Sequence, residues 1–445
     1  MADEQKTLDP AATTPSGARA TAGDSPAPDR AAPARRWAFG LVAVGLVLAA
    51  LNLRPAITSL GALLEEVSAD LHMSGSVAGV LTSVPPLCFA VFGITAPRLA
   101  RRFGPAAVVC AGMAAIFTGL VLRPFATGTA AFLAASALAL MGIAVSNVLM
   151  PVIVKRYFPD RVGSMTGLYS MALALGTSVA AAATVPMTDA LGGGWRLGLG
   201  VWAVLAALAV LPWLPLLRDR DTEPAPRAAA ATDTPASAPQ ASASRNAPAQ
   251  TPAPRITRSR TAWALGVFFG LQATGAYITM GWMPQIFRDA GVPATTAGVL
   301  LAVTMVMGVP LAFVIPRLAT RMKNQGPIVV ALGLCGLTGY TGLFLAPAAG
   351  AWVWAVLLGI SNCSFPLALT MIGMRSRTGA GVVRLSAFAQ SVGYLISIPG
   401  PLLVGVLYQH SGGWGLPVAL MGGLMVPQMI VGTLAGRDRT VEDEC

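Results

Sequence analysis

The chain has 445 residues, of which 55% are hydrophobic and only 11% are charged, and its mean hydropathy is +0.66. A soluble domain carries roughly a quarter charged residues, so this composition excludes an ordinary water-soluble protein. Apolar runs long enough to cross a bilayer, ~18 residues or more, recur along the chain. The net charge of +11 is spread over short clusters between these runs, which argues against a nucleic-acid partner. We therefore expect a membrane protein embedded in a lipid bilayer.

The five cysteines show neither paired nor metal-ligand spacing. Four of them lie inside apolar runs, where a free thiol behaves as a small hydrophobic group. We expect no disulfide, no metal site and no cofactor. The chain also has no Walker A loop, so any transport should use gradients rather than nucleotide hydrolysis.

Three polar segments punctuate the chain. Residues 1–36 are rich in Ala, Pro, Thr and Asp and are predicted to be a disordered tail, with no signal-peptide pattern. Residues 218–260 form an Ala/Pro/Ser/Thr/Arg stretch of low complexity, which predicts a disordered linker. Residues 437–445 are predicted to be a short C-terminal tail.

Apolar segments between Gly, Pro and Arg clusters predict six transmembrane helices in each half of the chain. The first six are expected at 38–64, 75–97, 105–123, 129–154, 163–187 and 195–217. The second six are expected at 262–286, 295–316, 326–346, 351–373, 384–408 and 414–435. The prediction is an all-α membrane protein, with a bundle at 37–217 and a second bundle at 261–436.

The basic residues predict the orientation of these helices. With an even helix count and the N-terminus inside, all but four of the 30 Lys and Arg fall on the cytoplasmic side. The four exceptions are Arg54, Arg123, Arg196 and Arg288. This distribution obeys the positive-inside rule and predicts a bacterial inner-membrane protein with both termini in the cytoplasm.

Short sequence matches recur at a constant offset of 219 residues. They are Ala78-Gly79-Val80-Leu81 with Ala297-Gly298-Val299-Leu300, Pro97-Arg98-Leu99-Ala100 with Pro316-Arg317-Leu318-Ala319, Gly193-Gly194-Trp195 with Gly412-Gly413-Trp414, and Arg218-Asp219-Arg220 with Arg437-Asp438-Arg439. Four matches in one register indicate an internal repeat. Because each copy would hold an even number of helices, both six-helix bundles should share one orientation, related by an axis along the membrane normal.

Three motifs point to a family. The first predicted helix contains Leu51-Asn52-Leu53-Arg54-Pro55-Ala56-Ile57-Thr58-Ser59, the second is followed by Arg101-Arg102-Phe103-Gly104, and the eleventh opens with Arg384-Leu385-Ser386-Ala387-Phe388-Ala389-Gln390. Together they resemble the cyanate and nitroimidazole porter branch of the major facilitator superfamily. The resemblance implies the major facilitator fold, and it covers everything except the tail and the linker.

Two features depart from the wider superfamily pattern. Its loop after the second helix usually carries an acidic residue where this chain has Arg101, so the usual loop salt bridge is not expected. The remaining candidates for gating residues are basic: Arg98, Arg101, Arg102, Arg317 and Arg321. The fifth helix also lacks the Gly-Pro motif associated with drug/proton antiporters, which makes drug efflux by proton exchange the less favoured function.

Arg54 is the strongest candidate for a binding residue. An arginine near the middle of a transmembrane helix costs about 2.5–3.5 kcal/mol on insertion scales, so its presence suggests a function. Its planar fork of donors suits a small anion, a nitro group or a carboxylate. The alternative is a structural role, with carbonyl or amide groups as partners, because no acidic residue is expected inside a helix.

Other polar residues are expected at membrane depth, where they must face protein or a water-filled cavity. The candidates for the cavity lining are Asn52, Thr58, Asn147, Tyr169, Gln272, Asn362, Gln390 and Tyr394. Hydrogen bonds between helices are the alternative role for each of them.

These features predict a secondary active transporter that moves a small anionic or polar solute, such as a cyanate-like anion or a nitro compound, by alternating access. Efflux of drugs or nitroaromatic compounds is the first alternative, and a membrane-embedded sensor or enzyme is a remote one. We expect a monomer that is not an enzyme. Coupling to a proton or a counter-anion is open, since the nearest carboxylates, Glu65 and Glu66, are predicted at an outer helix end.

Overall fold

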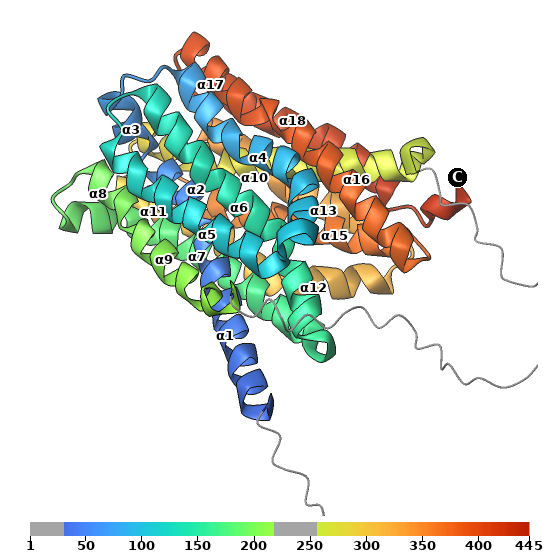
Figure 1. Cartoon of the computed structure of the whole chain (residues 1–445). Helices are drawn as coiled ribbons and strands as arrows, with labels where there is room; N and C mark the ends of the chain where they lie inside the picture. Colours follow the sequence, from blue (N-terminus) through green and yellow to red (C-terminus); the bar gives the residue numbers. More distant parts are fainter. Residues whose placement is uncertain (1–30, 218–255, 445) are drawn as a thin grey trace, which may run out of the picture.

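The computed structural model describes residues 31–217 and 256–444. The predicted tail up to residue 30 and the predicted linker over 218–255 lie outside the described residues. Where it is described, the chain folds into helices and short connections, without β-strands (Figure 1).

The first half folds into six membrane-crossing segments. They are α1 (Ala31–Asn52) with α2 (Pro55–Ala62) and α3 (Leu64–Asp70), α4 (Gly75–Phe103), α5 (Pro105–Leu122), α6 (Thr129–Tyr157), α7 (Val162–Ala190), and α8 (Trp195–Gly200) with α9 (Trp202–Val210). α1 begins at Ala31, so the predicted disordered tail ends earlier than residue 36.

The second half repeats this pattern. Its segments are α10 (Arg260–Asp289), α11 (Ala294–Val306) with α12 (Gly308–Arg321), α13 (Gly326–Leu345), α14 (Ala351–Ser361) with α15 (Ser364–Met374), α16 (Gly379–Ser397) with α17 (Pro399–Ser411), and α18 (Gly415–Ala435). Eleven described segments are long and apolar enough to span a membrane. The remaining one, α10, is 30 residues long, carries Gln272 and Gln285, and is buried along most of its length.

The twelve predicted helices are therefore present, as two six-helix bundles, but several are broken inside the membrane. The first helix breaks at Arg54, because Pro55 has no N–H to continue the hydrogen-bond ladder and instead starts α2. The tenth breaks at Asn362, which ends α14 before α15 begins at Ser364. Such breaks are tolerated in lipid only where the freed backbone is covered by protein or lines a cavity.

The helix ends define two faces of the molecule. The arginine-rich face carries Arg101, Arg102, Arg317 and Arg321, at the ends of α4 and α12. The opposite face carries α3 and the turns after α7 and α17. Figure 1 shows α4 of the first half beside α17 of the second half, which pack closely near the opposite face.

The C-terminal residues up to Glu444 fold back onto the second bundle. Val441 is buried and donates its backbone N–H to the carbonyl of Arg375 at 2.9 Å. The Glu444 carboxylate accepts hydrogen bonds from the hydroxyls of Ser259 and Thr261 at the start of α10. An acidic group at a helix N-terminus is favoured by the free N–H groups and by the helix dipole.

Candidate functional site

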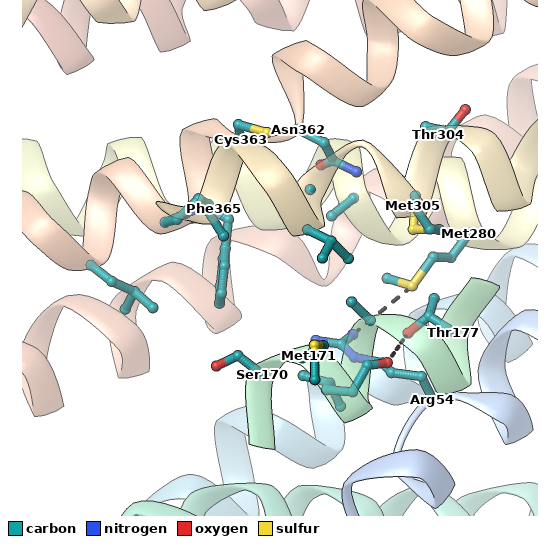
Figure 2. Close-up of a pocket in the computed structure, with 18 of the residues that line it drawn as sticks. Arg54, Ser170, Met171, Thr177, Met280, Thr304, Met305, Asn362, Cys363 and Phe365 are labelled. Atoms are coloured by element: carbon teal, nitrogen blue, oxygen red, sulfur yellow. Dashed lines mark hydrogen bonds between the residues drawn. The ribbon is translucent and has the colours of Figure 1, made fainter. Parts of the chain in front are cut away.

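A cavity of about 410 Å³ lies between the two bundles. The first half contributes Arg54 and one face of α7, from Thr166 to Thr177. The second half contributes residues of α10, α11, α12, α15 and α16 and the α14–α15 break. Figure 2 shows Arg54, Ser170, Met171 and Thr177 on one wall, facing Met280, Met305 and Asn362 on the other.

Arg54 sits at the break in the first helix and reaches into this cavity. Its Nη1 lies 3.9 Å from the sulfur of Met280, a weak acceptor on the other bundle (Figure 2). Among the described residues, no carboxylate pairs with it. The guanidinium is partly buried, and its neighbours are a thioether and the Tyr277 hydroxyl rather than the carboxylate that a buried charge normally has.

Two tyrosines lie near Arg54 in the cavity. Tyr277 and Tyr394 line the cavity, and both of their hydroxyls lie within electrostatic range of the guanidinium. Tyr394 stacks on Phe89 of the first half with ring centroids 5.0 Å apart. These rings combine an apolar face with a polar tip, as in many small-molecule sites.

A chain of three amides runs through the second bundle to the cavity. Gln428 Nε2 donates to Gln272 Oε1 at 3.1 Å. Gln272 Nε2 donates to Asn362 twice, to the side-chain Oδ1 at 2.8 Å and to the backbone carbonyl at 3.2 Å. Gln428 and Gln272 are buried, whereas Asn362 lines the cavity.

The predicted binding residues divide into two groups. Arg54, Asn362 and Tyr394 line the cavity, and Gln272 lies directly behind Asn362. The other five do not line it. Thr58 is buried and its hydroxyl donates to the carbonyl of Arg54. Asn52 is buried beside Met113, with its Nδ2 3.9 Å from the sulfur.

The remaining three predicted residues make local hydrogen bonds. The hydroxyl of Tyr169 donates to Asn147 Oδ1 inside the first bundle. Gln390 Nε2 donates to Ser386 Oγ at 2.7 Å, one turn earlier on its own helix. These contacts match the alternative role, hydrogen bonding between or within helices.

The five candidate gating arginines are all exposed at the arginine-rich face. Arg98 Nη1 lies 3.5 Å from the carbonyl of Ile94, and Arg102 lies over the Phe103 ring. In the part of the chain that the structure describes, none of the five has a carboxylate partner. They therefore do not join the two bundles at this face.

The opposite face is closed by an ion-pair lock, which we define as Arg288 with Glu65 and Glu66. Arg288 of α10 makes two hydrogen bonds to Glu66 of α3, at 2.8 and 3.0 Å, and lies 2.9 Å from Glu65. Gln285 Nε2 also donates to Glu65 at 3.2 Å. The lock joins the two halves at this face. These carboxylates, predicted at an outer helix end, therefore pair with the other half of the chain.

Several important residues escaped the sequence analysis. Tyr277 and Met280 line the cavity but stand in apolar stretches that read as core, and Gln428 lies in an otherwise apolar helix. Arg123 is completely buried, with hydrogen bonds to Ser136 Oγ at 3.0 Å and to the carbonyl of Ala56 at 2.9 Å. Its position next to a predicted helix end gave no sign of this burial.

Known proteins resemble the chain along most of its length. It is 36% identical to the uncharacterized transporter YycB of Bacillus subtilis (strain 168) over 406 residues, which cover 89% of this chain and 94% of that protein. It is 30% identical to the 2-nitroimidazole transporter of Escherichia coli (strain K12), covering 89% and 95%. It is 28% identical to the cyanate transport protein CynX of the same organism, covering 86% and 94%.

Solved transporter structures share the fold. The nucleoside transporter NupG superposes with a TM-score of 0.68 at 13% identity, covering 89% of this chain and 98% of that one. A bacterial homologue of the human lysosomal transporter Spinster, in an inward-facing and occupied conformation, gives a TM-score of 0.66 at 16% identity, covering 91% and 96%.

The model of the Major Facilitator Superfamily matches residues 42–397, which span both bundles. The predictions of a multi-pass membrane transporter, and of a transporter rather than an enzyme, are confirmed by this match and by the relatives. The relatives also confirm the cyanate and nitroimidazole porter branch. The chain belongs to the major facilitator superfamily.

Proposed function

We propose that this transporter moves a small anionic or polar solute by alternating access, with Arg54 as the principal binding charge. The observation that carries the proposal is the Arg54 guanidinium, which lies in the cavity between the bundles and has no acidic partner in the described part of the chain. Binding a substrate is one of the few functions that explains why an arginine is kept at this depth, where its insertion into the membrane costs free energy.

The backbone around Arg54 supports an anion as ligand. Arg54 is the N-cap of α2, so the positive end of that helix dipole lies beside the guanidinium. Discontinuous helices of transporters commonly direct such ends at anionic groups of the substrate. The relatives whose names give 2-nitroimidazole and cyanate support a ligand that is an anion or carries a nitro group.

Efflux of nitroaromatic compounds or drugs is the second candidate. The apolar side chains of the cavity favour it, because Met171, Met280, Met305, Phe313 and Phe365 offer an adaptable surface to an uncharged body. The two candidates differ in direction and in how far transport depends on Arg54.

The ion pairs of the two faces support an alternating-access cycle. The ion-pair lock joins the halves at the opposite face, while no ion pair among the described residues bridges the halves through the gating arginines. We propose that the arginine-rich face is cytoplasmic in a bacterial inner membrane, as the positive-inside rule requires. We also propose a monomer whose transport is coupled to a proton or a counter-anion.

The test is flux into proteoliposomes of labelled cyanate, nitrate, nitrite, small carboxylates and 2-nitroimidazole. We expect saturable flux that is lost in Arg54→Gln and retained in Arg196→Gln, a control that removes an exposed arginine paired only with Asp70. Equal flux in the Arg54→Gln variant would make Arg54 structural. No anion flux together with export of 2-nitroimidazole would favour the efflux candidate, and flux that responds to an imposed pH gradient would identify a coupled proton.

A further inference from the structure

The amide chain behind the cavity fixes which end of Asn362 faces a ligand. The backbone carbonyl of Asn362 can only accept a hydrogen bond, and Gln272 lies 3.2 Å from it, so this end of Gln272 must be its NH₂ group. The same NH₂ lies 2.8 Å from the Asn362 side chain, which must therefore present its oxygen to Gln272. The NH₂ group of Asn362 is then directed away from Gln272.

Gln428 holds this arrangement from behind. Gln272 uses its NH₂ on Asn362, so its oxygen faces Gln428, whose Nε2 donates to it at 3.1 Å. Gln272 is 3% exposed and Gln428 is 2% exposed, so no water competes for these groups. A reversed chain would place two acceptors, Gln272 Oε1 and the backbone carbonyl of Asn362, against each other, which a buried site disfavours strongly.

The Asn362 NH₂ group therefore faces the cavity as a free donor. Among the described residues it has no hydrogen-bond partner, although the residue lines the cavity. Arg54 supplies further donors from the other bundle, and Figure 2 shows the two residues on facing walls. Both walls thus offer donors, and neither of these two side chains offers an acceptor to the ligand.

The space between Arg54 and Asn362 indicates the size of the ligand. A triatomic anion needs about the volume of one or two waters, roughly 30–60 Å³, which is a small part of the 410 Å³ cavity. Much of the remaining lining is apolar or aromatic, including Met280, Met305, Phe365 and Tyr277. A planar apolar body would fill this part of the site.

We propose that Asn362 is a second ligand-binding residue, which Gln272 and Gln428 hold as a hydrogen-bond donor. The ligand class is an aromatic body carrying an acceptor-only planar group, a carboxylate or a nitro group, between Arg54 and Asn362. This inference rests on the proposed function and narrows its substrate class. Gln272 and Gln428 are positioning residues, since neither lines the cavity.

The experiment measures binding of labelled benzoate to the full chain in nanodiscs, with nitrobenzene and aniline as competitors. The two competitors are similar in shape and neutral, but nitrobenzene only accepts hydrogen bonds whereas aniline mainly donates them. The native protein should bind benzoate and prefer nitrobenzene to aniline. Asn362→Ala should weaken benzoate binding about tenfold, as expected for loss of one hydrogen bond to a charged group.

The positioning residues make a sharper test, because they do not touch the ligand. In Gln272→Met the Asn362 amide is free to turn its oxygen to the cavity, so binding of aniline should improve while binding of nitrobenzene weakens. Gln428→Met should change the preference in the same direction but less, since the backbone carbonyl still orients Gln272. A merely misfolded site would not gain affinity for aniline. Ser361→Ala is the control, because Ser361 is buried beside Asn362 but lies outside the amide chain.

Three results would overturn the inference. They are an unchanged preference in Gln272→Met, unchanged benzoate binding in Asn362→Ala, and failure of the native protein to bind either benzoate or nitrobenzene. The last result would leave the proposed function intact if cyanate or nitrate flux still depended on Arg54. Loss of all anion flux would instead reject the proposed function itself.

Discussion

Two arginines inside the first bundle show how the same residue type can serve structure or binding. Arg123 is fully buried, donates to Ser136 and to the carbonyl of Ala56, and lies over the Phe132 ring. Arg54 is partly buried, faces the cavity, and has the Met280 thioether and the Tyr277 hydroxyl beside it rather than a carboxylate. The first arginine is fixed by contacts within the fold, although its Nη2 has no hydrogen-bond partner among the described residues. The second has donors to spare for a ligand.

Substituting methionine at the two positions should therefore have opposite effects. Arg123→Met removes two buried hydrogen bonds and should lower the free energy of unfolding by about 1–3 kcal/mol. Arg54→Met removes an unpaired charge and should keep or raise stability, as often happens when a buried charge becomes apolar, while abolishing anion flux. Thermal unfolding in detergent and flux in proteoliposomes would check this. Equal destabilisation by both variants would contradict the distinction.

At the residue scale, the sequence indicated which polar residues lie at membrane depth, but not in every case whether their side chains face the cavity. Arg54, Asn362 and Tyr394 interrupt apolar runs and could be recognised as cavity residues. Asn52 lies before the helix break at Arg54 and is buried beside Met113, which the sequence could not indicate because the break was not predicted. Tyr277 and Met280 could not be recognised, since an apolar or aromatic residue looks the same in a core and in a cavity wall.

Glycines govern how closely helices of different bundles approach near the opposite face. A Cβ on Gly405 of α17 would lie 2.2 Å from the carbonyl oxygen of Gly75 on α4. A Cβ on Gly61 of α2 would lie 2.1 Å from the carbonyl oxygen of Met280 on α10. Real Cβ atoms do not approach backbone so closely, so the closed face depends on these glycines.

Gly405→Ala should thus shift the protein towards the state that is open at the opposite face. Overpacking costs about 1–3 kcal/mol, which corresponds to roughly a tenfold change in population. Labelling of Ser170→Cys from that face by an impermeant maleimide, in a background without the native cysteines, would report the change. Gly93→Ala on α4 is the control, because a Cβ there meets nothing within 4 Å. Equal labelling in both variants would refute the role of Gly405.

The C-terminal segment is a further element whose contribution to stability can be tested. Burial acts to raise the pKa of Glu444, but hydrogen bonds from Ser259 and Thr261 outweigh it and hold the pKa below the usual range. A carboxyl group with a lowered pKa in the folded state stabilises the fold above its unfolded pKa and loses that contribution as the pH falls through the folded pKa.

Glu444→Gln should therefore lower stability at neutral pH by about 0.5–1 kcal/mol, typical of a helix cap, and the difference should shrink in acid. Unfolding temperatures of native and variant protein between pH 7 and pH 4 would measure it. Asp438→Asn is a suitable comparison, since Asp438 is largely exposed and 3.8 Å from Arg375. A deficit that persists unchanged at pH 4 would contradict the assignment.

At the scale of the whole molecule, the sequence predicted the architecture well. Positive charges, helix count and a repeat of 219 residues all pointed to two bundles of six helices, because each depends only on the order of residues along the chain. The conformation of the transporter could not be predicted in this way. Which face is closed depends on contacts between residues far apart in sequence, such as Arg288 and Glu66, which are 222 residues apart.

The ion-pair lock supplies the last prediction. Arg288 is 16% exposed and Glu66 is 33% exposed, so the pair should contribute about 1–2 kcal/mol to closure, between a surface and a fully buried pair. Arg288→Glu replaces attraction by repulsion from Glu65 and Glu66, and should open this face to labelling of Ser170→Cys. Adding Glu66→Arg restores one opposite-charge pair across the halves and should recover part of the closure. If the reversed pair labels as fast as the single variant, Arg288 acts through packing rather than charge, and the lock is not electrostatic.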